Sequence, residues 1–425
     1  MVIDIAYGSR TLHFIPPDVV TWLGTLDIAE APELNDRDEA IRQALRQPIG
    51  LKHGLEGIVK PGETVAVIVS DAFRQTRADQ VLPILIAKLN DAGIPDTDIQ
   101  ILFATGVHRA PRWDEQVRIL GPAIFRRFKD RAFAHNPRDE ANLVGVGTTS
   151  RGTPVIVNRR AVEADRRIVV SAVVFHYFGG FGGGRKSILP GLASVESIAR
   201  NHSMNLDPAE DRLNPDVRIG ILDGNPVAED MLEAARLVGV DYTVNTVLNR
   251  HAQIAAVFAG ELDAAHRAAA DYARRLFAAP ISERADLVVA NAGPSRNFVQ
   301  SHKALYNAYQ AVKPDGRIVF IARCEEGLGG EAFSKWIRLG DRQAIIAGLR
   351  RHSEINGQTA LSTVEKAPIA LFVTDMTEEE VHTLGGRKSP TLEQAIATAL
   401  SELAPRSPIT GYIMPSAAYT VPLPA

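Results

Sequence analysis

Short, nearly continuous apolar segments alternate with longer helical patterns along this chain, and the alternation constrains its fold more than any other feature. The segment "TVAVIVS" (64–70) is typical of a buried strand, and the helical pattern "ADQVLPILIAKLNDAG" (78–93) separates it from a second strand, "IQILFA" (99–104). Further strands are predicted at 167–174, 285–293, 316–322 and 368–374, with a helix from about residue 301. Apolar strands separated by helices indicate an α/β fold with mainly parallel sheets.

The chain has 425 residues, which is enough for two or three domains. A helix ends at a proline within "FAAPISERAD" (277–286), where a new strand–helix series begins. The proline-punctuated segment at the end of the chain is strand-like and is expected to return to the first domain. We therefore predict two α/β domains, residues 1–278 plus 405–425 and residues 279–404, with the active site in the cleft between them.

Composition excludes several classes of function. The formal charge is −3 with both signs spread along the chain, so no concentrated basic face for nucleic acid or a membrane surface is expected. The single cysteine, Cys324, excludes an internal disulfide and a thiolate-built zinc or iron–sulfur site. No signal peptide and no apolar run long enough to span a bilayer are visible, which predicts a cytoplasmic protein.

The stretch "HYFGGFGGGRKSILPG" (176–191) resembles a phosphate-binding loop without being one. A Walker A loop requires glycine immediately before its lysine, and here Arg185 stands before Lys186. Pro190 follows four residues later, where it would remove a helical hydrogen bond. A second Gly-Gly-Arg-Lys-Ser copy occurs in "LGGRKSP" (384–390), where Ser389 and Pro390 are expected to be the N-cap and first residue of a helix. That copy is interpreted as structural.

Polar side chains follow several of the predicted strands, and the carboxyl ends of strands are where α/β sheets bind ligands. Loops after three further strands carry Asp71 and Arg74, then His108 and Arg109, then Gln300, His302 and Lys303. Together with His176 and Lys186 they predict a cationic pocket for a carboxylate, with at least two histidines for proton transfer.

These motifs, "SDAFR", "GVHR", the long glycine–lysine stretch, "NH" and "QSHK", resemble in order and spacing those of the nickel-dependent lactate racemase family, along the whole chain. The family comprises 2-hydroxyacid racemases and epimerases that use a nickel-pincer nucleotide. The resemblance implies that this pyridinium-derived thioamide mononucleotide is tethered to Lys186, with His202 as the nickel ligand. Cofactor-binding positions are then Asp71, expected also to orient Arg74, and the glycines of the motif, Gly182, Gly183 and Gly184. Enzymes that synthesise the cofactor are the partners it implies.

The resemblance also assigns roles in the reaction. In this family a hydride moves from Cα of a small anionic 2-hydroxy acid to the cofactor, giving a flat 2-keto acid that accepts hydride on either face. His108 and His176 match the two bases, one for each enantiomer. Substrate-binding positions are Arg74, Gln300 and Lys303. His302 is expected to be a residue at the beginning of the helix, and Trp336 is a candidate for an aromatic wall.

Several alternatives remain open at this point. The substrate can be a short aliphatic acid such as lactate, or malate, hydroxyglutarate, phenyllactate or a sugar acid. An additional cation in the pocket would favour a dicarboxylate, and Arg77, Arg109, Arg112 and Arg296 all lie near the motifs. The segment "NAYQAVKPDGRIVFIARC" resembles a late strand region of S-adenosylmethionine-dependent methyltransferases, although no glycine-rich nucleotide loop follows the first strand. A non-catalytic nucleotide-binding module is the third hypothesis.

Overall fold

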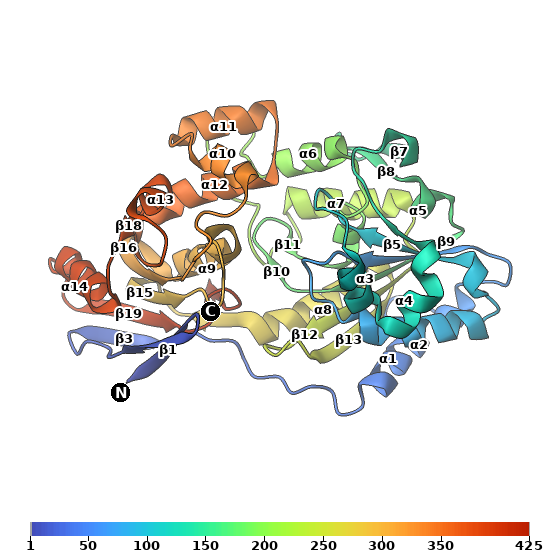
Figure 1. The fold of residues 1–425 in the computed structure, drawn as a ribbon, viewed down its shortest axis with the longest axis horizontal. Coiled ribbons are helices and arrows are strands. Elements are labelled where there is room, and N and C mark those ends of the chain that lie inside the picture. Colours follow the sequence, from blue (N-terminus) through green and yellow to red (C-terminus); the bar gives the residue numbers. More distant parts are fainter. Residues whose placement is uncertain (1, 425) are drawn as a thin grey trace. The chain divides into compact units, whose positions relative to one another are not determined.

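The computed structural model describes residues 2–424, and the chain divides into two compact units (Figure 1). The first, here called the glycine-motif unit, comprises Glu30–Asn205 and Asn214–Leu276. The second contains both ends of the chain and is called the terminal unit; it comprises the described parts of Met1–Ala29, Leu206–Leu213 and Phe277–Ala425. Each unit contains one six-stranded sheet, so the predicted α/β class is confirmed.

The glycine-motif unit is built on a sheet of order β13-β12-β9-β4-β5-β6, parallel except for the β12–β13 pair. Its elements are α1 (Arg37–Arg46), β4 (Val65–Ser70), α2 (Ala78–Asp91), β5 (Ile99–Ala104), α3 (Trp113–Leu120), α4 (Pro122–Phe128), β6 (Ala132–Ala134), β7 (Leu143–Thr148), β8 (Pro154–Asn158), α5 (Arg159–Glu163), β9 (Arg166–Ala172), β10 (Phe175–His176), β11 (Gly180–Phe181), α6 (Val195–Ser203), α7 (Pro226–Val238), β12 (Tyr242–Leu248), β13 (Ile254–Gly260) and α8 (Leu262–Phe277).

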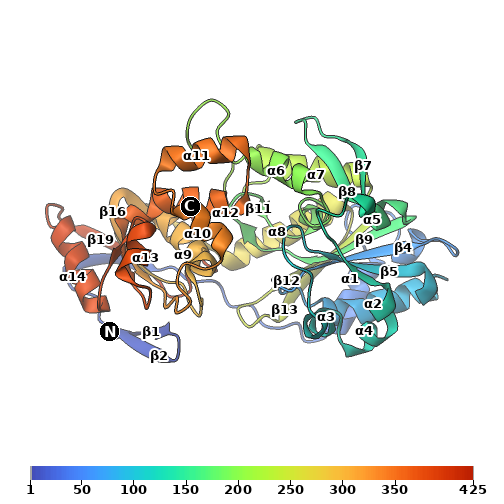
Figure 2. The ribbon, with the colours of Figure 1, turned by 45° about the horizontal axis from the view of Figure 1, so that its top comes forward.

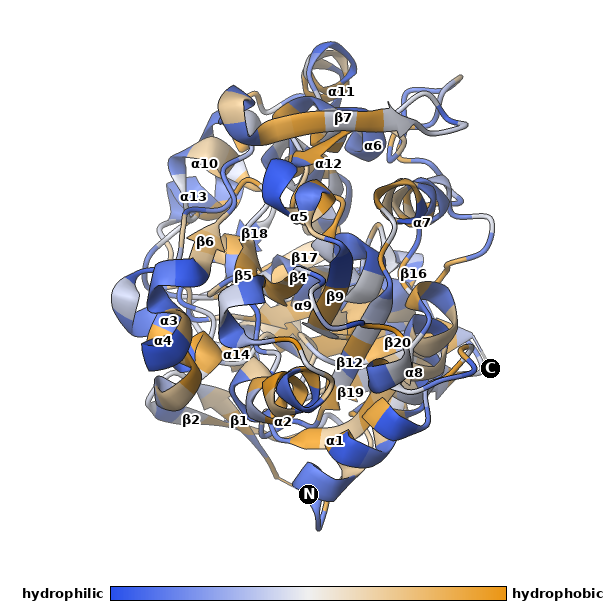
Figure 3. Cartoon of the chain, turned by 90° about the vertical axis from the view of Figure 1, so that its right-hand side faces the viewer, coloured by the Kyte–Doolittle hydropathy of each residue, from blue (hydrophilic) through white to orange (hydrophobic). Residues whose placement is uncertain are grey.

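Helices cover both faces of this sheet, which explains why its strands are apolar at successive positions. Alternate residues of β4 enter different cores: Val67 packs with α1, α2 and α4, whereas Ile68 packs with α5, α6 and α7. Figures 1 and 2 show these two groups of helices on opposite sides of the strands. In Figure 3 the covering helices carry both blue, hydrophilic residues and orange, hydrophobic residues, as expected for helices with one face in a core.

The terminal unit has a parallel sheet of order β18-β17-β16-β15-β19-β3. Its elements are β1 (Ile3–Tyr7), β2 (Arg10–Phe14), β3 (Val20–Thr25), β14 (Ala278–Ile281), β15 (Ala285–Asn291), α9 (Phe298–Ala311), β16 (Val312–Ile321), α10 (Glu331–Ile337), α11 (Arg342–Arg351), α12 (Ile355–Lys366), β17 (Ala370–Val373), α13 (Glu378–Thr383), β18 (Arg387–Lys388), α14 (Leu392–Leu403), β19 (Ile409–Met414) and β20 (Val421–Pro424). One core lies under α9, α10 and α12, and the other under α14 and the β1–β2 hairpin.

The chain is divided differently from the prediction of 1–278 plus 405–425 and 279–404. Strand β19 pairs with β15 on one side and β3 on the other, so both β19 and β3 belong to the sheet of residues 279–404. Strand β20 pairs with β14, which lies in the same unit. The segment therefore does not return to the first domain. Its apolar alternation fits either sheet, and pairing with β15 buries Tyr412 and Ile413 on the two faces of the terminal sheet.

The expected helix start at the second Gly-Gly-Arg-Lys-Ser copy is wrong by two residues. Helix α14 begins at Leu392, and its N-cap is Thr391, whose side chain accepts a hydrogen bond from the Gln394 amide at 3.2 Å. The Ser389 amide instead donates to the Phe372 carbonyl at 2.8 Å. Ser389 thus continues the sheet edge rather than capping the helix.

Among residues 2–424, no helix combines the length and apolar character needed to cross a membrane.

Candidate active site

Three adjacent strands of the glycine-motif unit end at one edge of its sheet, and the predicted catalytic residues follow them. Strand β4 lies between β9 and β5, and all three run parallel. Asp71 comes directly after β4, His108 lies in the loop after β5, and His176 and Lys186 lie in the glycine stretch after β9. The parallel register therefore gathers residues from three distant parts of the sequence at one carboxyl edge.

Asp71 and His108 form a hydrogen-bonded pair. The Asp71 carboxylate is buried, and its Oδ2 lies 2.6 Å from Nδ1 of His108. Its Oδ1 accepts from the Phe73 amide at 2.9 Å, which fixes the carboxylate in the loop. Because a carboxylate only accepts, Nδ1 of His108 carries the proton and Nε2 is the basic nitrogen. This arrangement suits His108 to accept a proton.

Asp71 does not orient the Arg74 side chain, as expected from the sequence, but holds His108 instead. The carboxylate contacts His108 and the Phe73 amide, while only the backbone of Arg74 bonds to Asp71, N to O at 3.4 Å. The Arg74 side chain is exposed. Oδ1 of Asp71 accepts a hydrogen bond from the amide of Phe73, two residues later in the chain. This tight turn holds the carboxylate against its own loop and away from the Arg74 side chain.

His176 and Lys186 are in contact within the glycine stretch. Nζ of Lys186 lies 3.0 Å from Nε2 of His176 and 4.8 Å from the centroid of the Phe178 ring. The Gly179 amide donates to Nδ1 of His176 at 3.1 Å. Both side chains are half-buried, so the lysine amine and the imidazole share one small polar position beside an aromatic ring.

His202 lies on α6, which begins at the Ser194 cap, and is 1% exposed. Its ring packs 4.7 Å from the ring of Phe178, the same ring that Lys186 contacts. Burial, and then the charge of Lys186, lowers the pKa of His202 to about 3. The imidazole is therefore neutral at physiological pH, which is the state in which histidine binds a metal.

The glycines of the stretch allow it to fold tightly. Gly183 and Gly184 have φ values of 75° and 50°, and a Cβ on them would lie 2.6 Å from the Ala172 carbonyl oxygen and 2.7 Å from the His266 ring. A Cβ on Gly182 would meet only ordinary contacts, at 3.6 Å or more. Close packing of the loop against its own unit therefore requires glycine at 183 and 184.

Arg185, Asp263 and His266 support this loop from the interior of the unit, a role that the sequence did not predict for any of them. Arg185 is 2% exposed; its Nη2 donates to Asp263 at 2.8 Å and to Nδ1 of His266 at 3.1 Å. Nε2 of His266 in turn donates to the Gly182 carbonyl at 2.9 Å. Burial lowers the pKa of His266 to about 3, so it is neutral, and burial lowers the pKa of Arg185 to about 10.

This network explains why arginine replaces the glycine of a Walker A loop. The side chain of Arg185 points into the unit, and Lys186, the next residue, is thereby turned toward His176. The sequence does contain a sign of this network. Asp263 and His266 in "ELDAAHRAAA" are three residues apart and therefore lie on one face of a helix.

In the terminal unit, Gln300 and Lys303 lie one turn apart on α9 and are both exposed. The Gln300 amide donates to the side chain of the N-cap Asn297 at 3.2 Å. His302 is not at the beginning of the helix, as expected, but within it and 2% exposed, beside Phe298 and Tyr306. Successive residues of a helix point in directions about 100° apart, so His302 faces the core although Lys303 is exposed.

Trp336 does not form an aromatic wall. It is 7% exposed, its Nε1 donates to Glu354 at 2.8 Å, and its ring fills the space left by glycines at 348 and 357.

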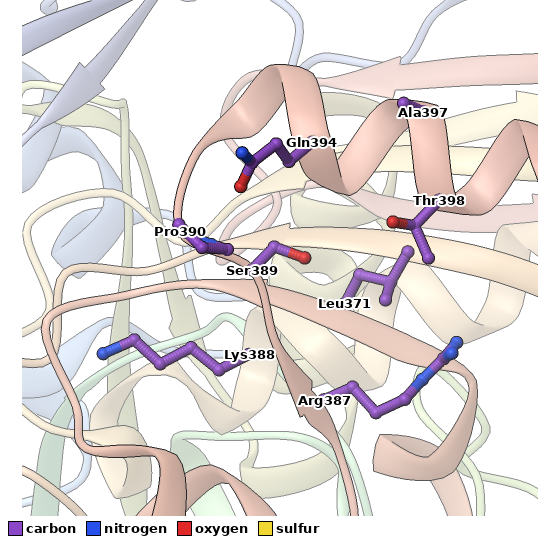
Figure 4. A pocket seen from close by; sticks show the side chains of 8 residues that line it. All are labelled: Leu371, Arg387, Lys388, Ser389, Pro390, Gln394, Ala397 and Thr398. Atoms are coloured by element: carbon purple, nitrogen blue, oxygen red, sulfur yellow. The ribbon is translucent and has the colours of Figure 1, made fainter.

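The second Gly-Gly-Arg-Lys-Ser copy lines a cavity of about 370 Å³ in the terminal unit (Figure 4). Arg387 there is paired with Glu402, and Lys388 donates to the Met376 carbonyl, pointing away from Arg387. Both cations are engaged in holding the fold.

Residues 2–424 contain no cluster of three or more histidine, cysteine, aspartate or glutamate side chains that could hold a metal ion. A metal at this site would therefore need most of its ligands from a bound organic group, with one imidazole from the protein.

Comparison with known proteins identifies relatives of the chain. Residues 7–213 match the family described as "Lactate racemase N-terminal domain", and residues 281–411 match "Lactate racemase C-terminal domain". The lactate racemase of Thermoanaerobacterium thermosaccharolyticum is 31% identical over 340 residues, covering 79% of this chain and 78% of that protein. The lactate racemase of Lactiplantibacillus plantarum is 32% identical over 338 residues, covering 78% of this chain and 77% of that protein.

Solved structures agree. The lactate racemase apoprotein from T. thermosaccharolyticum matches with a TM-score of 0.88 and 27% identity over 100% of both chains. A protein from Thermotoga maritima matches with a TM-score of 0.65 and 19% identity, over 93% of this chain and 100% of its own, which shows a shared fold.

Proposed function

Because this chain belongs to the lactate racemase family, and is therefore an isomerase, we propose that it interconverts the D and L forms of a small 2-hydroxy acid such as lactate, with a nickel-pincer nucleotide tethered to Lys186. The family assignment favours this activity over a methyltransferase or a nucleotide-binding module. Enzymes that synthesise the cofactor are the protein partners that the proposal requires.

The observation that carries the proposal is the arrangement of Lys186 and His202 around Phe178. An amine for covalent attachment and a neutral, buried imidazole both contact this one aromatic ring. The protein supplies one imidazole and no cluster of other ligands in its described part, which fits a metal held mainly by the sulfur and carbon atoms of an organic group. Lys186 would hold the nucleotide and His202 the nickel.

When bound, this group would accept the hydride from Cα of the substrate and return it to either face. The residues of the chain supply the proton transfers. As the C–H bond of one enantiomer breaks, its hydroxyl proton passes to Nε2 of His108, which Asp71 keeps basic by bonding to Nδ1. His176 takes the equivalent proton from the other enantiomer. The product of either step is a flat 2-keto acid, and reversal on the opposite face completes racemisation.

Binding of the substrate carboxylate is assigned to Arg74, with Gln300 and Lys303 as further donors. Arg74 is exposed at the same strand edge as Asp71, and a guanidinium matches the geometry of a carboxylate with two parallel N–H donors. Gln300 and Lys303 share one exposed face of α9, so they can act on a single ligand.

The test is peptide mass spectrometry of protein co-expressed with the cofactor-synthesising enzymes and nickel, combined with a chiral lactate assay. We expect a nucleotide-sized adduct on Lys186 and racemisation of either enantiomer. Lys388→Ala is the matched control, because Lys388 has the same Gly-Gly-Arg-Lys-Ser sequence around it and should leave both results unchanged. An unmodified Lys186, in a host that loads a known lactate racemase, would overturn the proposal.

A further inference from the structure

Phe73 presents an exposed aromatic ring beside His108. The ring is 52% exposed, and its centroid lies 4.9 Å from that of the His108 imidazole, with an angle of 60° between the planes. Its backbone amide donates to Asp71, so the residue is fixed by the same carboxylate that holds His108. A large aromatic side chain that faces solvent next to a proposed base, rather than a core, offers apolar surface to whatever binds there.

Two aliphatic side chains extend this apolar surface at the neighbouring strand ends. Val107, 45% exposed, immediately precedes His108, and Val174, 39% exposed, lies two residues before His176. Strands β5, β4 and β9 are adjacent and parallel, so the residues that follow them emerge at one edge. Each proposed base is thus accompanied by an exposed apolar side chain.

The arginines near these motifs are already paired, which bears on a second carboxylate in the substrate. Arg109 makes two bonds to the buried Glu115, at 2.6 and 2.7 Å, and its guanidinium lies 5.1 Å from the centroid of Phe73. The other three are engaged as well: Arg112 pairs with Asp114 and Glu115, Arg77 with Asp79, and Arg296 with Glu325 and Glu326. Recruiting any of them would break an existing ion pair.

Resting on the proposed function, we propose that Phe73 determines substrate specificity: its ring contacts the side chain of the 2-hydroxy acid and selects monocarboxylic acids with an alkyl or aryl side chain over dicarboxylates and sugar acids. Arg74 then binds the one carboxylate that all these substrates share. Each methylene buried against the ring should raise kcat/KM about fourfold, the usual value of removing one methylene from water.

The experiment measures kcat/KM of loaded enzyme for lactate, phenyllactate and malate, in wild type and in Phe73→Ala. We expect the wild type to prefer phenyllactate over lactate by at least about tenfold and to use malate least. Phe73→Ala should lower kcat/KM for phenyllactate by about tenfold or more and change that for lactate less than about threefold. Trp113→Ala is the control, since this 65% exposed aromatic packs on Phe125 rather than on His108 and should leave the ratios unchanged.

The outcomes separate the two proposals. Racemisation of lactate with identical substrate ratios in wild type and Phe73→Ala overturns the role of Phe73 and leaves the proposed function intact. A wild-type preference for malate overturns it as well. Calorimetry of phenyllactate and malate with unloaded protein adds a readout that does not depend on turnover: tighter binding of phenyllactate, lost in Phe73→Ala, supports the proposal, and its absence contradicts it.

Discussion

Nζ of Lys186 lies 3.0 Å from Nε2 of His176, so the proposed cofactor tether and one of the proposed bases contact each other directly. Conversion of the amine to a thioamide would change this contact and allow Nε2 of His176 to face the substrate. The unloaded protein would therefore have one base available, His108, and one engaged.

Removing the amine should accordingly make His176 more reactive. In unloaded Lys186→Met, carbethoxylation of His176 by diethylpyrocarbonate should be about fivefold faster than in wild type, the factor that corresponds to a hydrogen bond of about 1 kcal/mol. His108, which keeps its bond to Asp71, is the internal control and should react at an unchanged rate. Peptide mass spectrometry gives both rates, and equal acceleration of the two histidines would argue against the specific contact.

Loading and turnover should be separable by substitution. His108→Ala removes a base that does not contact Lys186 or Phe178 in any described interaction, so the adduct on Lys186 should form normally while racemisation falls by about 100-fold or more. His202→Ala should instead reduce the nickel content, because the one proposed protein ligand is lost. Intact mass, nickel analysis and the chiral assay distinguish the two variants. Full nickel content in His202→Ala would remove that residue from the site.

Asp71→Asn tests the tautomer of His108. An amide can donate to Nδ1, which would place the proton on Nε2 and leave the imidazole unable to accept one there. We expect kcat to fall by roughly 10²- to 10⁴-fold with little change in Tm. Asp79→Asn is a suitable control, since that carboxylate pairs with Arg77 and not with a histidine. A small change in kcat, below about tenfold, would mean that Asp71 does not set the tautomer.

Much of the fold could be predicted from the sequence, because strands such as Val65–Ser70 consist almost entirely of apolar residues, which indicates that they are buried. Partners in a parallel sheet are not encoded in that way: Ile409–Met414 is apolar enough for either sheet, and its partners β15 and β3 are far away in the sequence. The same holds at the site. The motif residues can be recognised in the sequence, but the structural role of Arg185 cannot, because its partners lie 78 and 81 residues away.

The stability of the terminal unit should depend on the ionisation of Asp286. Burial of this carboxyl would by itself raise its pKa, but hydrogen bonds from Thr410, Arg406 and Lys313 outweigh burial and hold the pKa well below its ordinary value. A lowered pKa in the folded state means that the stabilisation is complete above the unfolded value of about 3.9 and is lost as the pH falls below it. Stability should therefore decline from about pH 4 downward.

Asp286→Asn isolates this contribution. It should destabilise the protein by about 2 kcal/mol at pH 7, because two cations and the Thr410 hydroxyl lose a charged acceptor, and it should flatten the acid limb of the stability curve. Urea unfolding between pH 7 and pH 3 measures both effects. Asp315→Asn, which removes an exposed partner of the same Arg406, is the matched control and should cost less than about 1 kcal/mol. An unchanged acid limb in Asp286→Asn would mean that other carboxylates govern the loss of stability in acid.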